Sequence, residues 1–451
     1  MPIEYADSLD KILNAFEPEP LDSADLKTYY YDGTMESRTG DEYDSPLDDL
    51  ADACVRPSQH NAHLLLGHRG CGKSTELNRL RDRLKDEGYP VIIIRCITEL
   101  DILALSHWDI MVVISDVLCQ IADKEGCNLG ELQDKLLAFF NEIETIQETS
   151  KKGSLAVEAN VGLGTPGPLK PLLNLFAGLK SELKTGYERR EKIRERVEKR
   201  SSEWIAYIQE LNAILTTSLQ GKQPILIFED LDKIAEPEKV WHMFSYGPLA
   251  EMPFPVIYTF PIDLFYDGRF QGLEGRFKHV VLPLIKIRDQ NGKQYDNGIA
   301  VIKKILERRS NIERLFTPKV LEELIIKTGG SLRELFSCID QCASRALRRV
   351  RRTSVTTGAR IELEDAQRVL TKLQSDLSRM IERRQYAMLA KIHQEPKEAR
   401  AIEDKAMLLE LMRSHAVLEY NRKRWCAVHP LIVDFLEELG EIKTAQTSSC
   451  E

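Results

Sequence analysis

The stretch GHRGCGKST, residues 67–75, constrains the fold of this 451-residue chain more than any other segment. Its residues Gly67, Gly72, Lys73 and Ser74 fit the pattern G-x-x-x-x-G-K-[ST]. The apolar residues HLLL before it favour a β-strand, and ELNRLRDRLKDEG after it favours a helix. A strand, a glycine-rich loop and a helix in this order predict an α/β fold with a parallel sheet.

The same stretch predicts a site for a triphosphate. Glycines let successive backbone N–H groups turn toward phosphate oxygens, and the next helix directs the positive end of its dipole at the same anion. Lys73 would reach the β and γ phosphates, Ser74 would ligate Mg²⁺, and Thr75 would touch the α phosphate. The rest of the cradle would be Gly67, His68, Arg69, Gly70, Cys71 and Gly72. The alternative is a glycine-rich turn whose lysine lies in solvent.

A second apolar stretch, PILIFEDLDKI at residues 224–234, ends in three acids. Its first residues predict a short buried strand, and Glu229, Asp230 and Asp232 follow at the carboxyl end, where α/β sheets bind ligands. One carboxylate would hold the Mg²⁺ shell and its neighbour would act as a general base. By position Glu229 is the metal acid and Asp230 the base, although the commoner order places an aspartate first. An acidic cap on a surface loop is the alternative.

Composition describes a globular chain, with 43% hydrophobic and 29% charged residues. We find no uncharged apolar run of ~18 residues, and the start MPIEYADSLDKI lacks the cations and apolar core of a secretory signal. The nine cysteines are scattered and have no CxxC spacing. We therefore expect a cytoplasmic protein with reduced thiols and no membrane segment. The net charge of −9 argues against nucleic acid wrapped over the whole surface but permits local basic patches.

The order of these elements resembles the AAA+ and STAND branches of the P-loop ATPases. It is most similar to origin-recognition-like and KAP-like proteins, whose second motif strand ends in DDLD where this chain has EDLD. The further apolar stretches are PVIIIRC (90–96), PVIYTF (255–260) and HVVLPL (279–284). The resemblance implies a five-stranded sheet in the order 5-1-4-3-2, ATP and Mg²⁺ as ligands, ATP hydrolysis, and assembly into a homo-oligomer. It covers roughly residues 25–100 and 220–440.

The resemblance also implies roles for three residues outside the two motifs. Thr259 ends the fourth strand, where the family carries a polar sensor of the γ phosphate. Arg276, with Arg269 in reserve, matches an arginine that reaches the nucleotide of the neighbouring subunit. Arg333, after a glycine pair, matches a lid arginine that touches the phosphates. The alternatives are an ordinary β-branched strand residue and two surface arginines.

The chain departs from the family between its second and third strands, where residues 97–223 form a long insertion. The stretch ALSHWDIMVVISDVLCQIADK predicts a core helix, and residues 147–171, rich in glycine, proline and serine, predict a loop. Residues 184–215 alternate in charge and predict one long helix, either solvated or in contact with a partner.

These patterns predict four regions. Residues 1–60 form an N-terminal linker and base-binding segment, in which Tyr31, Asp32 and Arg38 lie near the place of the family's adenine signature. Its aromatic residues would either stack on a base or fill the edge of the sheet. An ATPase core spans 61–300, with a helical insertion at about 100–220. A helical lid spans 301–380, and a winged-helix-like domain spans 381–451 with its hairpin turn at 421–423.

Two functions remain open. The first is an oligomeric ATP-dependent switch with a protein effector, a layout that the resemblance connects with bacterial conflict and antiphage ATPases. The helix before the hairpin favours this, because its net charge of about −1 would repel phosphates. The second is an ATP-dependent nucleic-acid loader or remodeller of the origin-recognition or transposition-regulator kind. It would use the arginine run 345–360, which comprises Arg345, Arg348, Arg349, Arg351, Arg352 and Arg360.

Overall fold

The centre of the molecule is a five-stranded parallel sheet. The computed structural model describes residues 3–56, 60–144, 169–185, 187–353, 359–396, 401–420 and 424–442. Its sheet has the strand order β2-β3-β4-β1-β5, which is the predicted order 5-1-4-3-2 viewed from the other edge. All four pairings are parallel. The strands are β1 (Ala62–Leu66), β2 (Val91–Arg95), β3 (Ile225–Glu229), β4 (Val256–Phe260) and β5 (Lys278–Val281).

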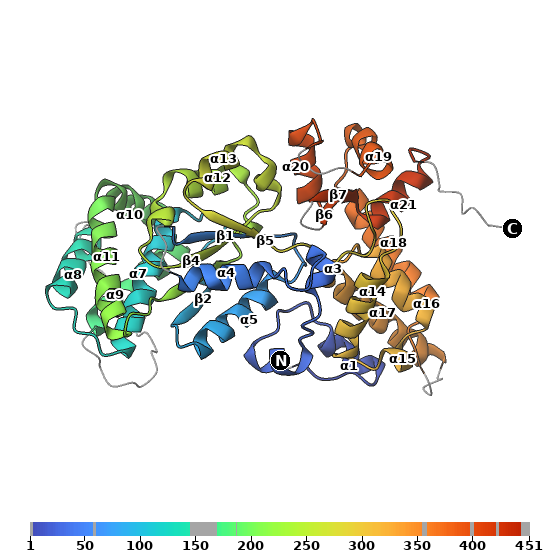
Figure 1. The fold of residues 1–451 in the computed structure, drawn as a ribbon, viewed down its shortest axis with the longest axis horizontal. Coiled ribbons are helices and arrows are strands. Elements are labelled where there is room, and N and C mark those ends of the chain that lie inside the picture. Colours follow the sequence, from blue (N-terminus) through green and yellow to red (C-terminus); the bar gives the residue numbers. More distant parts are fainter. Residues whose placement is uncertain are drawn as a thin grey trace.

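Alternate side chains of the inner strands enter two different cores, because successive residues of a strand point to opposite faces. Leu65 and Ile227 pack against α4 (Pro46–Val55) and α5 (Lys73–Asp86). Leu64, Leu66 and Phe228 pack on the other face, against α7 (His107–Lys124), α11 (Ser201–Ser218) and α12 (Pro237–Tyr246). Figure 1 shows α12 and α4 on opposite sides of the sheet. Covering on both faces explains why these strands are continuous apolar runs.

The edge strand β5 is shorter than the sequence predicted. The apolar stretch 279–284 suggested a strand to its end, whereas β5 ends at Val281. Leu282 still donates its backbone N–H to Leu66 O at 2.9 Å. Pro283 follows and has no N–H to donate, so the ladder stops there.

The insertion forms a helical body at one end of the sheet (Figure 1). Its helices are α8 (Glu131–Glu144), α9 (Lys170–Thr185), α10 (Tyr187–Lys199) and α11. Its core is aromatic: Trp204 contacts the rings of Phe139 and Phe140 and donates its indole N–H to Ser115 Oγ at 2.9 Å. Most of the loop predicted at 147–171 lies outside the described residues.

The prediction of one long helix over residues 184–215 was wrong. The backbone breaks at Arg200 (φ −123°, ψ 23°), which separates α10 from α11 and lets α11 bury Trp204. The charges of α10 are not simply solvated either. Arg190 is buried and donates two hydrogen bonds to Asp101 at 3.1 Å, and Arg194 pairs with the buried Asp109.

The other end of the sheet carries the helical unit that the sequence predicted as a lid, a name kept below, and a C-terminal unit (Figure 1). The lid comprises α14 (Asp296–Glu307), α15 (Ile312–Leu315), α16 (Pro318–Lys327), α17 (Leu332–Thr353) and α18 (Leu363–Ser378). The N-terminal helix α1 (Leu9–Ala15) packs into the same apolar core. The remaining short helices are α2 (Ser23–Tyr29), α3 (Met35–Thr39), α6 (Cys96–Glu99) and α13 (Gln271–Glu274).

The C-terminal unit, residues 381–442, contains the hairpin that the sequence predicted. Its elements are α19 (Tyr386–Gln394), α20 (Lys405–Arg413), β6 (Val417–Tyr420), β7 (Trp425–Val428) and α21 (Pro430–Glu438). β6 and β7 pair antiparallel, and the predicted turn 421–423 lies outside the described residues. A parallel bridge between Leu284 and Tyr420 places this ribbon beside the chain that leaves β5. Within the described residues, no helix has the length and apolar character to cross a bilayer.

Candidate nucleotide-binding site

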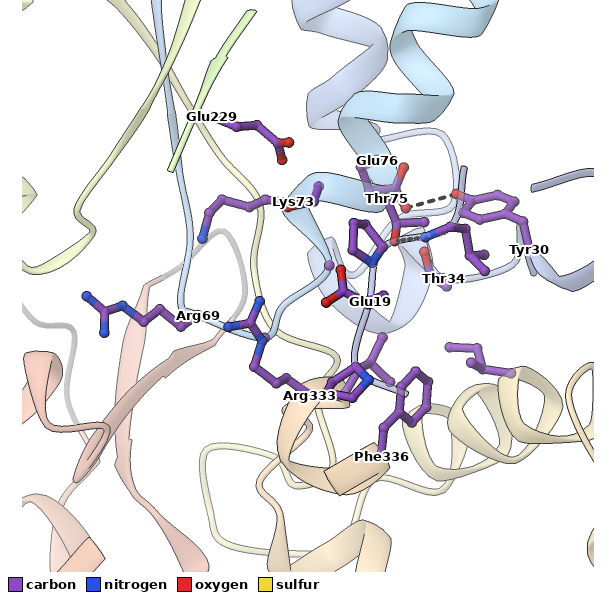
Figure 2. Close-up of a pocket in the computed structure, with 18 of the residues that line it drawn as sticks. Glu19, Tyr30, Thr34, Arg69, Lys73, Thr75, Glu76, Glu229, Arg333 and Phe336 are labelled. Atoms are coloured by element: carbon purple, nitrogen blue, oxygen red, sulfur yellow. Dashed lines mark hydrogen bonds between the residues drawn. The ribbon is translucent and has the colours of Figure 1, made fainter. Parts of the chain in front are cut away.

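A pocket lies at the carboxyl ends of β1, β3 and β4, where segments far apart in the chain meet (Figure 2). The loop 67–75, hereafter the P-loop, forms its floor together with the end of β3. Residues 18–38 of the N-terminal segment and the first turns of α17 form the other walls. The described pocket therefore contains the two sequence motifs and two regions that are remote from them in the chain.

The glycines of the P-loop are required by its backbone and by its neighbours. Gly70 (φ +84°) and Gly72 (φ +100°) are left-handed, and Gly72 begins helix α5. A Cβ atom on Gly70 would lie 2.6 Å from Ser331 Oγ and 2.9 Å from Arg333 Cβ. The lid turn thus packs directly on the loop, and Leu332 N–H donates to Gly70 O at 3.1 Å.

Lys73 is buried and held from three sides, so the solvated-lysine alternative does not hold. Its Nζ donates to Gly67 O at 2.6 Å and His68 O at 3.0 Å, and it lies 3.0 Å from Asp232 Oδ2. Burial would lower the pKa of Lys73, but the charge of Asp232 outweighs it and raises that pKa. The reciprocal attraction overcomes burial and lowers the pKa of Asp232. The two groups form a buried ion pair.

Asp232 is a site residue to which the sequence analysis gave no separate role. It is the third acid of EDLD, and the 3₁₀ turn Leu231–Lys233 after β3 brings its carboxylate back to the P-loop lysine. The third acid of EDLD was the available signal. Asp232 lies two residues beyond Asp230, so a tight turn after β3 brings its carboxylate into the same pocket.

Ser74 and Glu229, the two predicted metal ligands, line the same pocket. Arg95 Nε lies 3.7 Å from Glu229 Oε2. Burial raises the pKa of Glu229, the nearby Ser74 hydroxyl opposes this, and the nearby Asp230 adds to it. A hydroxyl and a buried carboxylate with little cationic compensation are donors that fit Mg²⁺. Among the described residues no three His, Cys, Asp or Glu side chains could hold an ion together, so phosphate and water oxygens would complete its shell.

Asp230 and Thr259 shape the turn after β3. Asp230 is left-handed (φ +73°), lines the pocket, and its Oδ1 lies 2.6 Å from Lys233 Nζ. Thr259 is buried, and its hydroxyl accepts the backbone N–H of Leu231 at 3.0 Å. The predicted phosphate sensor therefore also fixes the backbone that carries the acids.

The predicted arginines lie in two different places. Arg333 is exposed at the start of α17, lines the pocket, and extends toward the P-loop in Figure 2. Arg276 lies outside the pocket: its guanidinium donates to Ser245 O at 2.7 Å and Gly247 O at 3.0 Å, at the carboxyl end of α12. Arg269 pairs with Asp267 and Glu238. The proposed reach of Arg276 into a neighbouring subunit remains a prediction about an assembly.

The N-terminal segment crosses the pocket and is fastened to the P-loop helix. Leu21 N–H donates to Thr75 Oγ1 at 3.3 Å, and the Tyr30 hydroxyl donates to Glu76 at 2.9 Å (Figure 2). Tyr31 and Arg38 line the pocket as expected, although Arg38 is buried and donates to Pro283 O at 2.5 Å; Asp32 is not among the lining residues. Sequence reasoning missed Pro18–Leu21, Ile305, Arg309 and Phe336, which also line this end. The paired prolines in PEPL were the available signal for the first of these.

Comparisons with known proteins add little to this geometry. No family model matches the chain, and no curated protein is similar to it. Among solved structures it is similar to Cdc6p from Pyrobaculum aerophilum, with 12% identity over 88% of this chain and 92% of that chain and a TM-score of 0.34. It is also similar to a variant of RuvB from Thermotoga maritima, with 10% identity over 90% and 98% and a TM-score of 0.33. Its own sheet order and P-loop give the chain the fold class of the P-loop NTPases.

Proposed function

We propose that this chain binds ATP with Mg²⁺ and hydrolyses it to ADP and phosphate. The observation that carries the proposal is the convergence of Lys73, Ser74, Glu229 and Asp230 on one pocket at the carboxyl ends of the strands. A cation for the phosphates, a hydroxyl and carboxylate for the metal, and a second carboxylate beside them are the groups that phosphoryl transfer to water requires.

Each group has a distinct task in this proposal. Lys73 exchanges its contact with Asp232 for the β and γ phosphates, so that the phosphate charge is compensated as it is buried. Ser74 and Glu229 would hold Mg²⁺, which supplies charge stabilisation between the β and γ phosphates. Asp230 accepts a proton from the attacking water, and Arg333 approaches the phosphates from the lid. Thr259 keeps the acid-bearing turn in place.

We further propose that hydrolysis operates a switch in a homo-oligomer. Leu332 in the lid contacts Gly70 of the P-loop directly, which supports nucleotide-dependent movement of the lid. In an assembly, Arg276 would leave the carbonyls at the end of α12 to reach a neighbour's phosphate. The C-terminal unit would recruit a protein effector, and the chain would then act as a regulator or as part of an antiphage or conflict defence.

A second candidate function is the ATP-dependent binding of nucleic acid. The observation that favours it is at the carboxyl end of α17, where Arg351, Arg352 and Arg360 are exposed and form no ion pair with any described residue. Arg349, by contrast, pairs with Glu362 and Asp365. Exposed arginines collected on a chain of net charge −9 provide a local surface for phosphate backbones.

The test compares the wild-type chain with Lys73→Ala. We expect Mg²⁺-dependent release of phosphate from ATP by the wild type, and at least ~100-fold weaker binding of a fluorescent ATP analogue by the variant, because the phosphates lose their buried cation. Wild-type affinity in the variant would contradict the site. Size measurements with a slowly hydrolysed ATP analogue, with and without DNA, separate the oligomeric switch from the nucleic-acid function.

A further inference from the structure

A partly buried acid on the lid joins the nucleotide pocket to the C-terminal unit. Glu334 immediately follows Arg333 in the first turn of α17, and only 14% of its side chain is exposed. Its Oε1 lies 3.2 Å from His415 Nδ1, and its Oε2 lies 3.0 Å from His429 Nε2. Both carboxylate oxygens are therefore held by the C-terminal unit, by the two histidines that flank the β6–β7 ribbon at its open end.

The hydrogen bonds fix the orientation of this group. His429 Nδ1 accepts the backbone N–H of Leu431 at 3.2 Å, so its Nε2 carries the proton that is donated to Glu334. His415 has a left-handed backbone conformation (φ +61°), which is uncommon outside glycine and is tolerated best by asparagine, aspartate and histidine. Burial would raise the pKa of Glu334, but the two histidines lower it to about 2, so the carboxylate is charged.

The same part of the C-terminal unit also holds the P-loop. His68, the second residue of the P-loop, is fully enclosed and accepts the backbone N–H of Glu419 at 2.9 Å. Its ring meets that of His415 edge to face, with centroids 5.9 Å apart. The Tyr420 hydroxyl donates to Gly329 O at 2.6 Å, just before α17. P-loop, lid turn and ribbon are thus connected by short, buried contacts.

We propose that Glu334 is a positioning residue: clamped by His415 and His429, it holds the first turn of α17 so that Arg333 faces the bound phosphates. Turnover then depends on the docked C-terminal unit, although none of the described residues of that unit lines the pocket. The inference rests on the proposed ATPase function. Its physical basis is that the direction of the long, exposed Arg333 side chain depends on the position of its backbone. The contacts of the adjacent Glu334 with two histidines fix that backbone.

The test is the variant Glu334→Gln, which keeps the shape of the side chain. Its amide has a single acceptor oxygen, so it can accept a hydrogen bond from only one of the two histidines. We expect kcat to fall by about tenfold with unchanged ATP affinity, because the misplaced group acts after binding. In an Arg333→Ala background the same substitution should have no further effect, since Glu334 acts through Arg333. Should Glu334→Gln not fold, His415→Asn serves instead, because asparagine tolerates the left-handed backbone.

Asp434→Asn is the matched control. Asp434 on α21 pairs with Lys327 on α16 at 2.5 Å, so it also joins the C-terminal unit to the lid but lies outside the clamp. It should leave kcat unchanged. An equal loss of kcat in Asp434→Asn, a wild-type kcat in Glu334→Gln, or effects that multiply with Arg333→Ala would overturn the positioning role alone. A wild-type chain that hydrolyses no ATP would instead overturn the proposed function and this inference with it.

Discussion

The phosphate end of the pocket and the interface with the C-terminal unit each contain a pair of carboxylates, buried or nearly so, whose pKa values shift in opposite directions. In the pocket, Lys73 lowers the pKa of Asp232, whereas burial raises that of Glu229. At the interface, two histidines lower the pKa of Glu334 against the effect of burial, whereas burial raises that of Glu419 to about 7.

The difference between the two regions is access. Glu229 lines an open pocket together with Ser74, so a metal ion can supply the missing positive charge. Glu419 is 2% exposed, and its carboxylate accepts a hydrogen bond from the Tyr266 hydroxyl. A ligand or metal ion in solution therefore has no access to it. A raised carboxyl pKa therefore indicates a ligand site only where the group faces a cavity.

The largest effect is expected from Asp232→Asn, which breaks the buried pair with Lys73. Loss of one partner leaves an uncompensated buried charge, so the free energy of unfolding should fall by about 4 kcal/mol. ATP should restore much of the loss, because its phosphates replace the carboxylate beside Lys73. Urea unfolding with and without ATP measures both effects. Glu236→Gln, which removes an exposed pair with Lys239, is the control, and equal stability of the two variants would contradict the buried pair.

The interface carboxylates should give opposite pH dependences of stability. The pKa of Glu334 is lowered in the folded state, so its contribution is complete above the unfolded value of about 4.5 and is lost as the pH falls toward 2. The pKa of Glu419 is raised, so its ionisation costs stability as the pH rises from about 4.5 through 7. Each shift corresponds to about 3 kcal/mol at most. Glu334→Gln should flatten the plot of unfolding free energy against pH in the acid range, and Glu419→Gln should flatten it near neutral pH. If each variant instead flattened the other range, the assigned directions of the two pKa shifts would be wrong.

Within the pocket, Asp230→Asn and Glu229→Gln should have different kinetic effects. Asp230→Asn should keep ATP binding but lower kcat about a hundredfold, because the acceptor for the water proton is lost. Glu229→Gln should mainly raise the Mg²⁺ concentration required for ATP binding. Titrations of Mg²⁺ and ATP with each variant make the comparison. If the two phenotypes are exchanged, the site stands and the assignment of its acids is reversed.

The smallest effect is expected from Arg276→Ala in a single chain. Its guanidinium binds the last carbonyls of α12, so its loss should lower stability by about 1 kcal/mol, as for other helix-end interactions. Thermal unfolding measures this. Mixing tests the alternative role: a Lys73→Ala chain keeps Arg276, and if it restores a turnover that Arg276→Ala has lost, then Arg276 completes a neighbour's site.

The phosphate end was predictable because its residues are positioned locally. Lys73 and Ser74 begin the helix that follows β1, and Glu229 is the last residue of β3, so their places follow once each strand is identified. Parallel strands bring their carboxyl ends to one edge, so these residues meet there. The strand order itself came from the family resemblance, and the sheet confirms it. The pairing of Lys73 with Asp232 was not predicted, because it depends on the path of one 3₁₀ turn.

The sequence by itself determined the parallel sheet, the P-loop and the acids beside it, since each is encoded by a short pattern whose geometry hydrogen bonding within the backbone enforces. Only the tertiary structure decided that Arg276 caps a helix, that residues 184–215 break at Arg200, and that Glu334 meets His415 and His429. The contacts of Arg276 and Glu334 join residues tens of positions apart, without periodicity. Their partners are chosen by which surfaces the packed cores bring together, and a local pattern contains no information about that choice.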